Sequence, residues 1–161
     1  MVLRYLELFS LNIPAKCREF VQKLGDVGVR TVNIEFGGTQ ADPDYDTNHT
    51  TTLQVTSLDG LAEGRLVVSG EQVVFIEFGA GIYYNGAAGS SPHPLGKRFG
   101  YLIGEYGRHY GRRRAWYYQD DVTGQWIKTH GVRAQMPVWK ATQEMIAQIG
   151  SVAKEVFGNV G

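Results

Sequence analysis

Apolar residues near the N-terminus recur at the spacing of an amphipathic helix. Between residues 13 and 27 they lie three or four positions apart in most steps: Ile13, Cys17, Phe20, Val21, Leu24 and Val27. Asn12 is a favourable N-cap and Pro14 is tolerated in a first turn, while Gly25 or Gly28 would end the helix. The pattern therefore predicts a helix over about residues 14–27. Residues 2–9 could extend this helix or pair as a strand.

From residue 29 to residue 78 the apolar period changes to two. Four segments have the alternation of strands: RTVNIEF, TTLQVTSL, GRLVVSG and QVVFIEF. Gly70-Glu71 separates the last two segments and predicts a hairpin turn. The region therefore predicts an antiparallel sheet of about four strands. A second hairpin is predicted for AWYYQDDVTGQWIKTH, with its turn at Asp120–Gly124.

The C-terminal segment has the clearest helical pattern. Pro137 fits a helix start, Gly158 fits a helix end, and apolar positions between them alternate at four and three: Val138, Thr142, Met145, Ile149, Val152 and Val156. The predicted fold class is α+β, as one domain over residues 1–161. We expect an antiparallel sheet with the N-terminal and C-terminal helices packed on it. Long loops are expected at about 37–50 and 79–111, and the second is rich in glycine and aromatic residues.

Composition narrows the class of protein. The 161 residues are 43% hydrophobic, which is enough for an ordinary core. The single cysteine, Cys17, excludes an internal disulfide and fits a reducing compartment; its place on the apolar helix face favours core packing. The N-terminal stretch lacks the features of a signal peptide, and no apolar run is long enough to span a membrane. We therefore expect no membrane association.

The charge is unevenly distributed although the formal net charge is zero. Six acidic residues and no lysine or arginine lie between Arg30 and Arg65, whereas Lys97 to Arg114 holds six basic residues and one acidic residue. This separation suits self-association in which the acidic side of one copy meets the basic side of the next. Two separately solvated loops would give the same pattern.

The motifs for catalysis, metal binding and nucleotide binding are incomplete. FGAGIYYNGAAG lacks the Lys-Ser/Thr ending of a P-loop, and DPDYD lacks the glycine and closing glutamate of a calcium loop. The four histidines have no zinc-ligand spacing, and no GxSxG nucleophile motif is present. We therefore expect no catalytic residue, no metal and no cofactor, and a small hydrolase is disfavoured.

The segment GRHYGRRRAWYY is the best candidate for nucleic-acid binding. Its arginines could neutralise phosphates, and its aromatic residues could stack on exposed bases. Alternatively, Trp116 and Tyr118 belong to the core and the arginines pair with acids of a neighbouring chain. We favour this alternative because one short basic run in a chain of zero net charge gives weak affinity.

Three segments, in this order, resemble a known family: VVFIEFGAGIYYN, HPLGKRFGYLIGEYGRHYGRRRAWYY and TGQWIKTHGVRAQMPVWKATQEM. They are similar to the tail-component family of long-tailed, double-stranded-DNA bacteriophages, which are neck proteins of tail completion and head–tail joining. The matching stretches are Glu77–Gly81, Trp116–Tyr118, Thr129–Gly131 and Ala134–Ala141, within about residues 60–150. The chain has Ala80 where the family often has Thr, and Trp139 where it often has Phe or Tyr. Residues 1–58 carry no motif of the family, so a tail-completion protein and a tail terminator both remain open.

The resemblance implies a structural virion protein without catalytic residues, assembled in the cytoplasm of the host bacterium. Its expected partners are further copies in a hexameric ring, the head-connector or stopper protein, and the tail-terminator or tail-tube protein. Double-stranded DNA would pass through the lumen without sequence-specific binding.

The glycine-rich stretch EFGAGIYYNG then has a proposed role as the end of a sheet strand and the start of an assembly loop. Glycines permit a turn or close approach, and tyrosines offer a large contact area. The alternative is that the tyrosines pack on their own domain. The predicted assembly interface consists of Glu77, Phe78, Gly79, Gly81, Tyr83, Tyr84, Asp42, Asp44, Asp46, Arg112, Arg113 and Arg114. A possible contact with channel DNA consists of Arg108, Arg112, Arg113 and Arg114.

Overall fold

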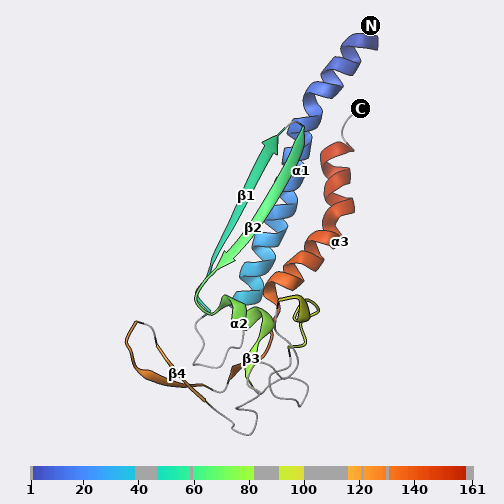
Figure 1. Ribbon diagram of the computed structural model, residues 1–161. Helices are drawn as coiled ribbons and strands as arrows, with labels where there is room; N and C mark the ends of the chain where they lie inside the picture. The colour runs from blue at the N-terminus through green and yellow to red at the C-terminus, as the bar shows by residue number, and fades with distance from the viewer. Residues whose placement is uncertain are drawn as a thin grey trace. The chain divides into compact units, whose positions relative to one another are not determined.

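The fold is described here from a computed structural model, which covers residues 2–38, 47–58, 60–81, 91–99, 116–120, 122–129 and 131–158 (Figure 1). Its main elements are the helices α1 (Val2–Gly37), α2 (Val73–Phe78) and α3 (Pro137–Phe157) and a hairpin of β1 (Thr50–Leu58) and β2 (Leu61–Ser69). The smaller elements are β3 (Ala80–Gly81), η1 (Lys97–Phe99), β4 (Trp116–Gln119), β5 (Trp126–Thr129) and β6 (Gly131–Val132). An N-terminal helix, an antiparallel strand pair and a C-terminal helix confirm the predicted α+β class.

The chain divides into two compact units. The first unit consists of residues 1–34, 51–68 and 138–161, and therefore holds most of α1, the β1–β2 hairpin and α3. The second consists of residues 35–50 and 69–137, and holds α2 and the short strands β3 to β6. That the whole chain is one domain stays a prediction.

In the first unit, α1 is much longer than the sequence predicts, with 36 residues. It passes through Gly25 and Gly28, so the prediction that one of them ends the helix is wrong. The reason is close packing: a Cβ atom added at Gly25 would lie 2.5 Å from a methyl carbon of Leu53 in β1. One added at Gly28 would lie 2.7 Å from the sulfur of Met145 in α3 and 3.0 Å from a methyl carbon of Leu66 in β2. The two glycines therefore let the hairpin and α3 approach the helix closely.

The segment RTVNIEF is helical, and its prediction as a strand is wrong. Val32 and Phe36 are buried, but Ile34 between them is 64% exposed. Residues four apart share one side of a helix and also one side of a strand, whereas residues two apart share a side only in a strand. Ile34 therefore distinguishes the two structures, and its exposure agrees with a helix.

The strands β1 and β2 and the helix α3 run alongside α1 (Figure 1). The first part of β1 alternates between exposed and half-buried positions, as predicted, and Leu53 belongs to its half-buried side. Helix α3 confirms the predicted C-terminal helix and ends where the Gly158 N–H donates to the Lys154 carbonyl, 2.8 Å away. The rings of Phe157 in α3 and Phe20 in α1 lie 5.8 Å apart.

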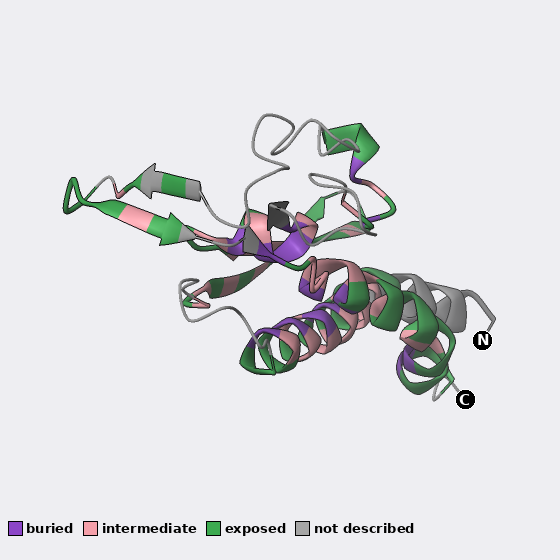
Figure 2. Ribbon diagram, turned by 90° about the horizontal axis from the view of Figure 1, so that it is seen from below, coloured by how far each residue is buried: buried purple, intermediate pink, exposed green. Residues whose placement is uncertain are grey.

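In the second unit, the segment QVVFIEF forms the short helix α2, so its prediction as a strand is wrong. Val73 and Ile76 are three residues apart and are buried on one side of this helix (Figure 2). The predicted hairpin at Gly70-Glu71 and the four-stranded sheet are therefore wrong as well. The described strands pair two by two, as β1–β2, β3–β6 and β4–β5.

The predicted hairpin after residue 115 is confirmed. Strands β4 and β5 pair antiparallel, with Trp116 opposite Thr129 and Gln119 opposite Trp126. Its turn is held by Asp120, whose carboxylate accepts hydrogen bonds from the Thr123 hydroxyl and backbone N–H at 2.7 and 2.6 Å. None of the described helices is long and apolar enough to cross a membrane.

Candidate functional site: a buried glutamate–histidine clamp

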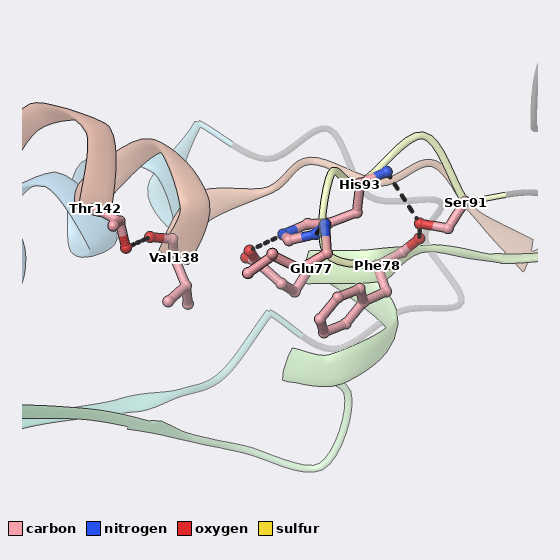
Figure 3. Close-up of polar contacts among 7 residues, drawn as sticks. Glu77, Phe78, Ser91, His93, Val138 and Thr142 are labelled. Atoms are coloured by element: carbon pink, nitrogen blue, oxygen red, sulfur yellow. Dashed lines mark hydrogen bonds and ion pairs between the residues drawn. The ribbon is translucent and has the colours of Figure 1, made fainter. Parts of the chain in front are cut away.

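The C-terminal end of α2 and the segment that begins at Ser91 are joined by side-chain hydrogen bonds (Figure 3). The Glu77 carboxylate lies 2.9 Å from Nε2 of His93, and each residue is only 6% exposed. The Ser91 hydroxyl donates to the carbonyl of Phe78 at 2.6 Å and accepts from the His93 backbone N–H at 3.2 Å. We call Glu77, Phe78, Ser91 and His93 the clamp.

The hydrogen bonds of His93 determine which ring nitrogen carries the proton. The Leu95 backbone N–H donates to Nδ1 of His93 at 3.0 Å, so Nδ1 is an acceptor and holds no hydrogen. Nε2 then carries the hydrogen and donates it to the Glu77 carboxylate. Both ring nitrogens are therefore used in holding the chain, and the burial of the Glu77 carboxylate is offset by a hydrogen bond.

Aromatic packing and a backbone hydrogen bond support the clamp. The Phe78 ring lies 4.4 Å from the His93 ring and 5.7 Å from the Phe99 ring, measured between centroids. The Gln135 N–H donates to the Ile76 carbonyl at 2.8 Å, which ties a further segment to the end of α2. Gly79 follows with a φ of 80°, which a residue with a side chain rarely adopts. In the motif EFG, Glu77 therefore bonds His93, Phe78 packs against His93 and Phe99, and Gly79 allows the positive φ that follows α2.

The clamp defines where the following loop leaves the fold and where it returns. Residues 77–78 are bonded to residues 91–93, so the chain between them starts and finishes at one place. The loop begins with β3, whose Ala80 and Gly81 pair with Val132 and Gly131 of β6.

The structure brings together only some of the predicted site residues. Glu77 is buried in the clamp, Phe78 is half-buried, Gly79 follows α2 with a positive φ, and Gly81 is in β3. The prediction that this stretch ends a sheet strand is wrong, because it ends α2. The remaining predicted residues lie outside the described part of the chain: Asp42, Asp44, Asp46, Tyr83, Tyr84, Arg108, Arg112, Arg113 and Arg114.

Sequence reasoning missed Ser91 and His93. The signal available was Glu77 itself, since a carboxylate inside the apolar stretch VVFIEF needs a hydrogen-bond donor when it is buried. The sequence does not say which of many donors this is. The donor lies 16 residues away, across the loop that the clamp closes.

The clamp contains the residue types of a hydrolytic triad but not their geometry. An activated serine would donate its hydroxyl hydrogen to the imidazole. Here the Ser91 hydroxyl donates to the Phe78 carbonyl, and both imidazole nitrogens have other partners. Among the described residues, no group of three or more His, Cys, Asp or Glu could hold a metal ion. Ser91 and His93 therefore do not form a nucleophile–base pair in this arrangement.

A second exposed feature is the β4–β5 hairpin. Its register places Tyr117 opposite Lys128 and Gln119 opposite Trp126, so these four residues share one face. Tyr117 and Trp126 are 61% and 68% exposed. Large exposed aromatic side chains are typical of protein interfaces. The predicted core positions of this hairpin, the side chains of Trp116 and Tyr118, lie outside what the structure describes.

Comparisons of the chain with protein-family models, with curated proteins and with solved structures gave no match.

Proposed function

We propose that this chain is a structural protein of the neck of a long-tailed, double-stranded-DNA bacteriophage. In this role it completes the tail and joins it to the head connector, as a ring around the DNA channel. The resemblance of the motif series between about residues 60 and 150 to the tail-component family supports this proposal. No catalytic step is part of the role.

The clamp is the structural observation that carries the proposal. A loop that binds a partner loses less conformational entropy when its two ends are already fixed. The bonds from Glu77 to His93 and from Ser91 to Phe78 fix both ends of the loop. Between these ends lie Tyr83 and Tyr84, residues of a type that contributes strongly to protein interfaces. The clamp therefore suits the presentation of an assembly loop.

The charged segments suit contacts between neighbouring copies. We propose that the acidic segment with Asp42, Asp44 and Asp46 meets the basic segment Arg112–Arg114 of the next copy. Reversing the charge of the arginines should block assembly, and a matching reversal of the aspartates should restore it. Failure of rescue at every pairing would instead favour the arginines, with Arg108, as a basic lining of the DNA channel.

A joining assay tests the proposed function. Lysate from a phage that lacks this gene is mixed with the purified protein, and complete particles are counted by electron microscopy. Joined heads and tails of normal tail length support tail completion. Overlong tails without rescue would identify a tail terminator, which has to act during tail growth. Normal infectious particles from the defective phage would contradict the neck proposal and would bring nucleic-acid binding forward.

A paired substitution tests the loop in the same assay. Replacing Tyr83 and Tyr84 by Ala should leave the thermal unfolding midpoint within error and abolish joining, because the proposal places both side chains in an interface. A large fall in the midpoint would show that the tyrosines belong to their own core. Unchanged joining would remove the loop from the assembly interface.

A further inference from the structure

Helix α3 has an apolar face that is exposed to solvent. Ile146 and Ile149 are 56% and 46% exposed, and Phe157 at the end of the helix is also exposed. Gly150, which is also exposed, and Ala153, which is half-buried, lie on the same side of the helix. We call these five residues the exposed face of α3. It is distinct from the buried positions of α3, which include Ala141, Val152 and Val156.

Gly150 lies within this face, and the described residues give no packing reason for a glycine there. A glycine inside a helix costs about 1 kcal/mol relative to alanine. At Gly25 and Gly28 a Cβ atom would overlap Leu53 and Met145, which explains those glycines. At Gly150 a Cβ atom would meet no atom of the described residues within 4 Å. Close approach of another helix would make use of the missing side chain.

The N-terminal part of α1 extends past the end of α3. Met145 lies against Gly28, and Phe157 lies against Phe20, so the two helices run antiparallel and α3 ends beside Phe20. Residues 2–13 continue α1 beyond this point for about 18 Å, at 1.5 Å per residue. We call residues 2–13 the N-terminal segment.

The sequence of the N-terminal segment is that of an amphipathic helix. Val2, Leu6, Phe9 and Ile13 follow one another at intervals of four, three and four. A helical stretch of this length is marginally stable in water by itself. An apolar side of this kind is therefore expected to be stabilised by a partner.

We propose that the N-terminal segment of one copy docks on the exposed face of α3 in a second copy. The residues from Ile146 to Phe157 also span about 18 Å of helix, so the two surfaces match in length. The five residues of the exposed face carry no charge, which suits an apolar partner, and Gly150 permits close contact at its centre.

This contact is heterologous, because each copy uses its N-terminal segment toward one neighbour and its exposed face of α3 toward the other. Copies therefore join head to tail and close into a ring when the rotation between them allows it. The inference rests on the proposed function, because the docking would be a contact between neighbouring copies in the ring of the neck. One contact of this size is small, so association between two copies is expected to be weak and to depend on protein concentration.

Sedimentation velocity at several concentrations tests the docking with matched variants. Wild type should gain mass as its concentration rises. Ile146→Glu places a charge on the exposed face and should remain monomeric. Ala147→Glu places the same charge on the next residue, which is also exposed but about 100° around the helix, and should associate as wild type does. A wild type that is monomeric at every concentration, or an Ile146→Glu variant that associates, would overturn the proposal.

A mixing experiment identifies the occupant. Leu6→Glu alters the N-terminal segment and Ile146→Glu alters the exposed face, so each variant should be monomeric alone. Their mixture retains one intact surface of each kind and should form dimers but no larger species. Association of Leu6→Glu alone would indicate pairing of α3 with α3 and would overturn the proposal, as would a mixture that stays monomeric.

The variant Gly150→Gln tests whether association can be lost while the fold is retained. Glutamine is a better helix former than glycine and meets open space, so the unfolding midpoint should stay equal or rise while association falls. Normal association of this variant would contradict close approach at Gly150.

The joining assay separates this inference from the proposed function. If a defective phage is normal although mixed dimers form, the function fails and the docking stands. If joining is real but Ile146→Glu joins heads and tails as wild type does, the docking fails and the function stands.

Discussion

Gly25 lies inside α1, where alanine would normally stabilise a helix, and its contacts predict the opposite effect. Replacing glycine by alanine in a helix interior stabilises by about 1 kcal/mol. The new Cβ atom would lie 2.5 Å from one methyl carbon of Leu53 and 3.0 Å from its Cγ. Because the branch point of Leu53 is itself too close, rotation of the terminal methyl groups does not remove the overlap.

The two effects can be compared in magnitude. Overpacking of a core typically costs about 1–3 kcal/mol. The balance predicts that Gly25→Ala is less stable than wild type by about 0–2 kcal/mol, after the gain in helix propensity. The matched variant Gly150→Ala meets open space and should gain about 1 kcal/mol. The two variants should therefore differ by roughly 1–3 kcal/mol, although their chemical change is identical.

Thermal unfolding followed by circular dichroism, at a concentration where the protein is monomeric, measures this difference. For a chain of this size each 1 kcal/mol corresponds to about 2–4 °C in the unfolding midpoint. In the Gly25→Ala background, Leu53→Val should cost less than it does in wild type, because it relieves the overlap. If Gly25→Ala were as stable as Gly150→Ala, the close approach of β1 to α1 would be refuted.

Two further predictions concern the second unit. Glu77→Ala should lower the free energy of unfolding by about 1–3 kcal/mol, because it removes the acceptor of the buried His93 Nε2–H, while Glu77→Gln should cost less because it retains an acceptor oxygen. Limited proteolysis should cut Glu77→Ala faster between residues 79 and 91, and equal rates would argue against a clamp. Hydrogen bonds from the side chain and backbone of Thr123 and from the backbone of Val122 hold the pKa of Asp120 below its ordinary value. Since this folded-state pKa is depressed, the stabilisation by Asp120 is present above the unfolded pKa and is lost as pH falls through the folded pKa. Carbon-13 NMR titration should give a lower pKa for Asp120 in wild type than in Thr123→Ala, and equal values would contradict the turn geometry.

The parts of the fold that sequence predicts correctly are those whose signals are local. In α3 the apolar spacing agrees with a proline at the start and a glycine at the end, and no distant residue is needed to interpret them. The β4–β5 hairpin is similar, because Asp120 and its neighbours form the turn among themselves. The α+β class follows from these elements together with the N-terminal helix and the β1–β2 hairpin.

The parts that sequence predicts wrongly depend on distant contacts. Gly25 and Gly28 have the usual meaning of a helix end until the hairpin and α3 are known to pack against them. Val32 and Phe36 satisfy a strand and a helix equally, because four is a multiple of two and close to the helical repeat. The stretch that forms α2 is apolar at nearly every position, so its alternation does not distinguish a strand from a helix. Such segments acquire their structure from tertiary packing.

The sequence predicted part of the candidate site, but it predicted a different role for Glu77 from the one that the structure shows. The stretch from Glu77 to Gly81 is significant, but Glu77 acts inside the protein as a clamp residue and does not offer its side chain as a contact. Ser91 and His93 could not be paired with it from sequence, since the length of a loop does not say which residues meet at its base. The charged and tyrosine positions proposed for assembly stay predictions.

The measurement that tests the central proposal most directly is the position of this protein in a finished particle. Antibodies raised against the purified protein, coupled to gold, are applied to intact particles and to separated heads and tails of the phage that encodes it. The proposal predicts label at the head–tail junction of particles and at the head-proximal end of free tails. Label along the tail, at its distal end or on no particle at all would contradict a role in the neck.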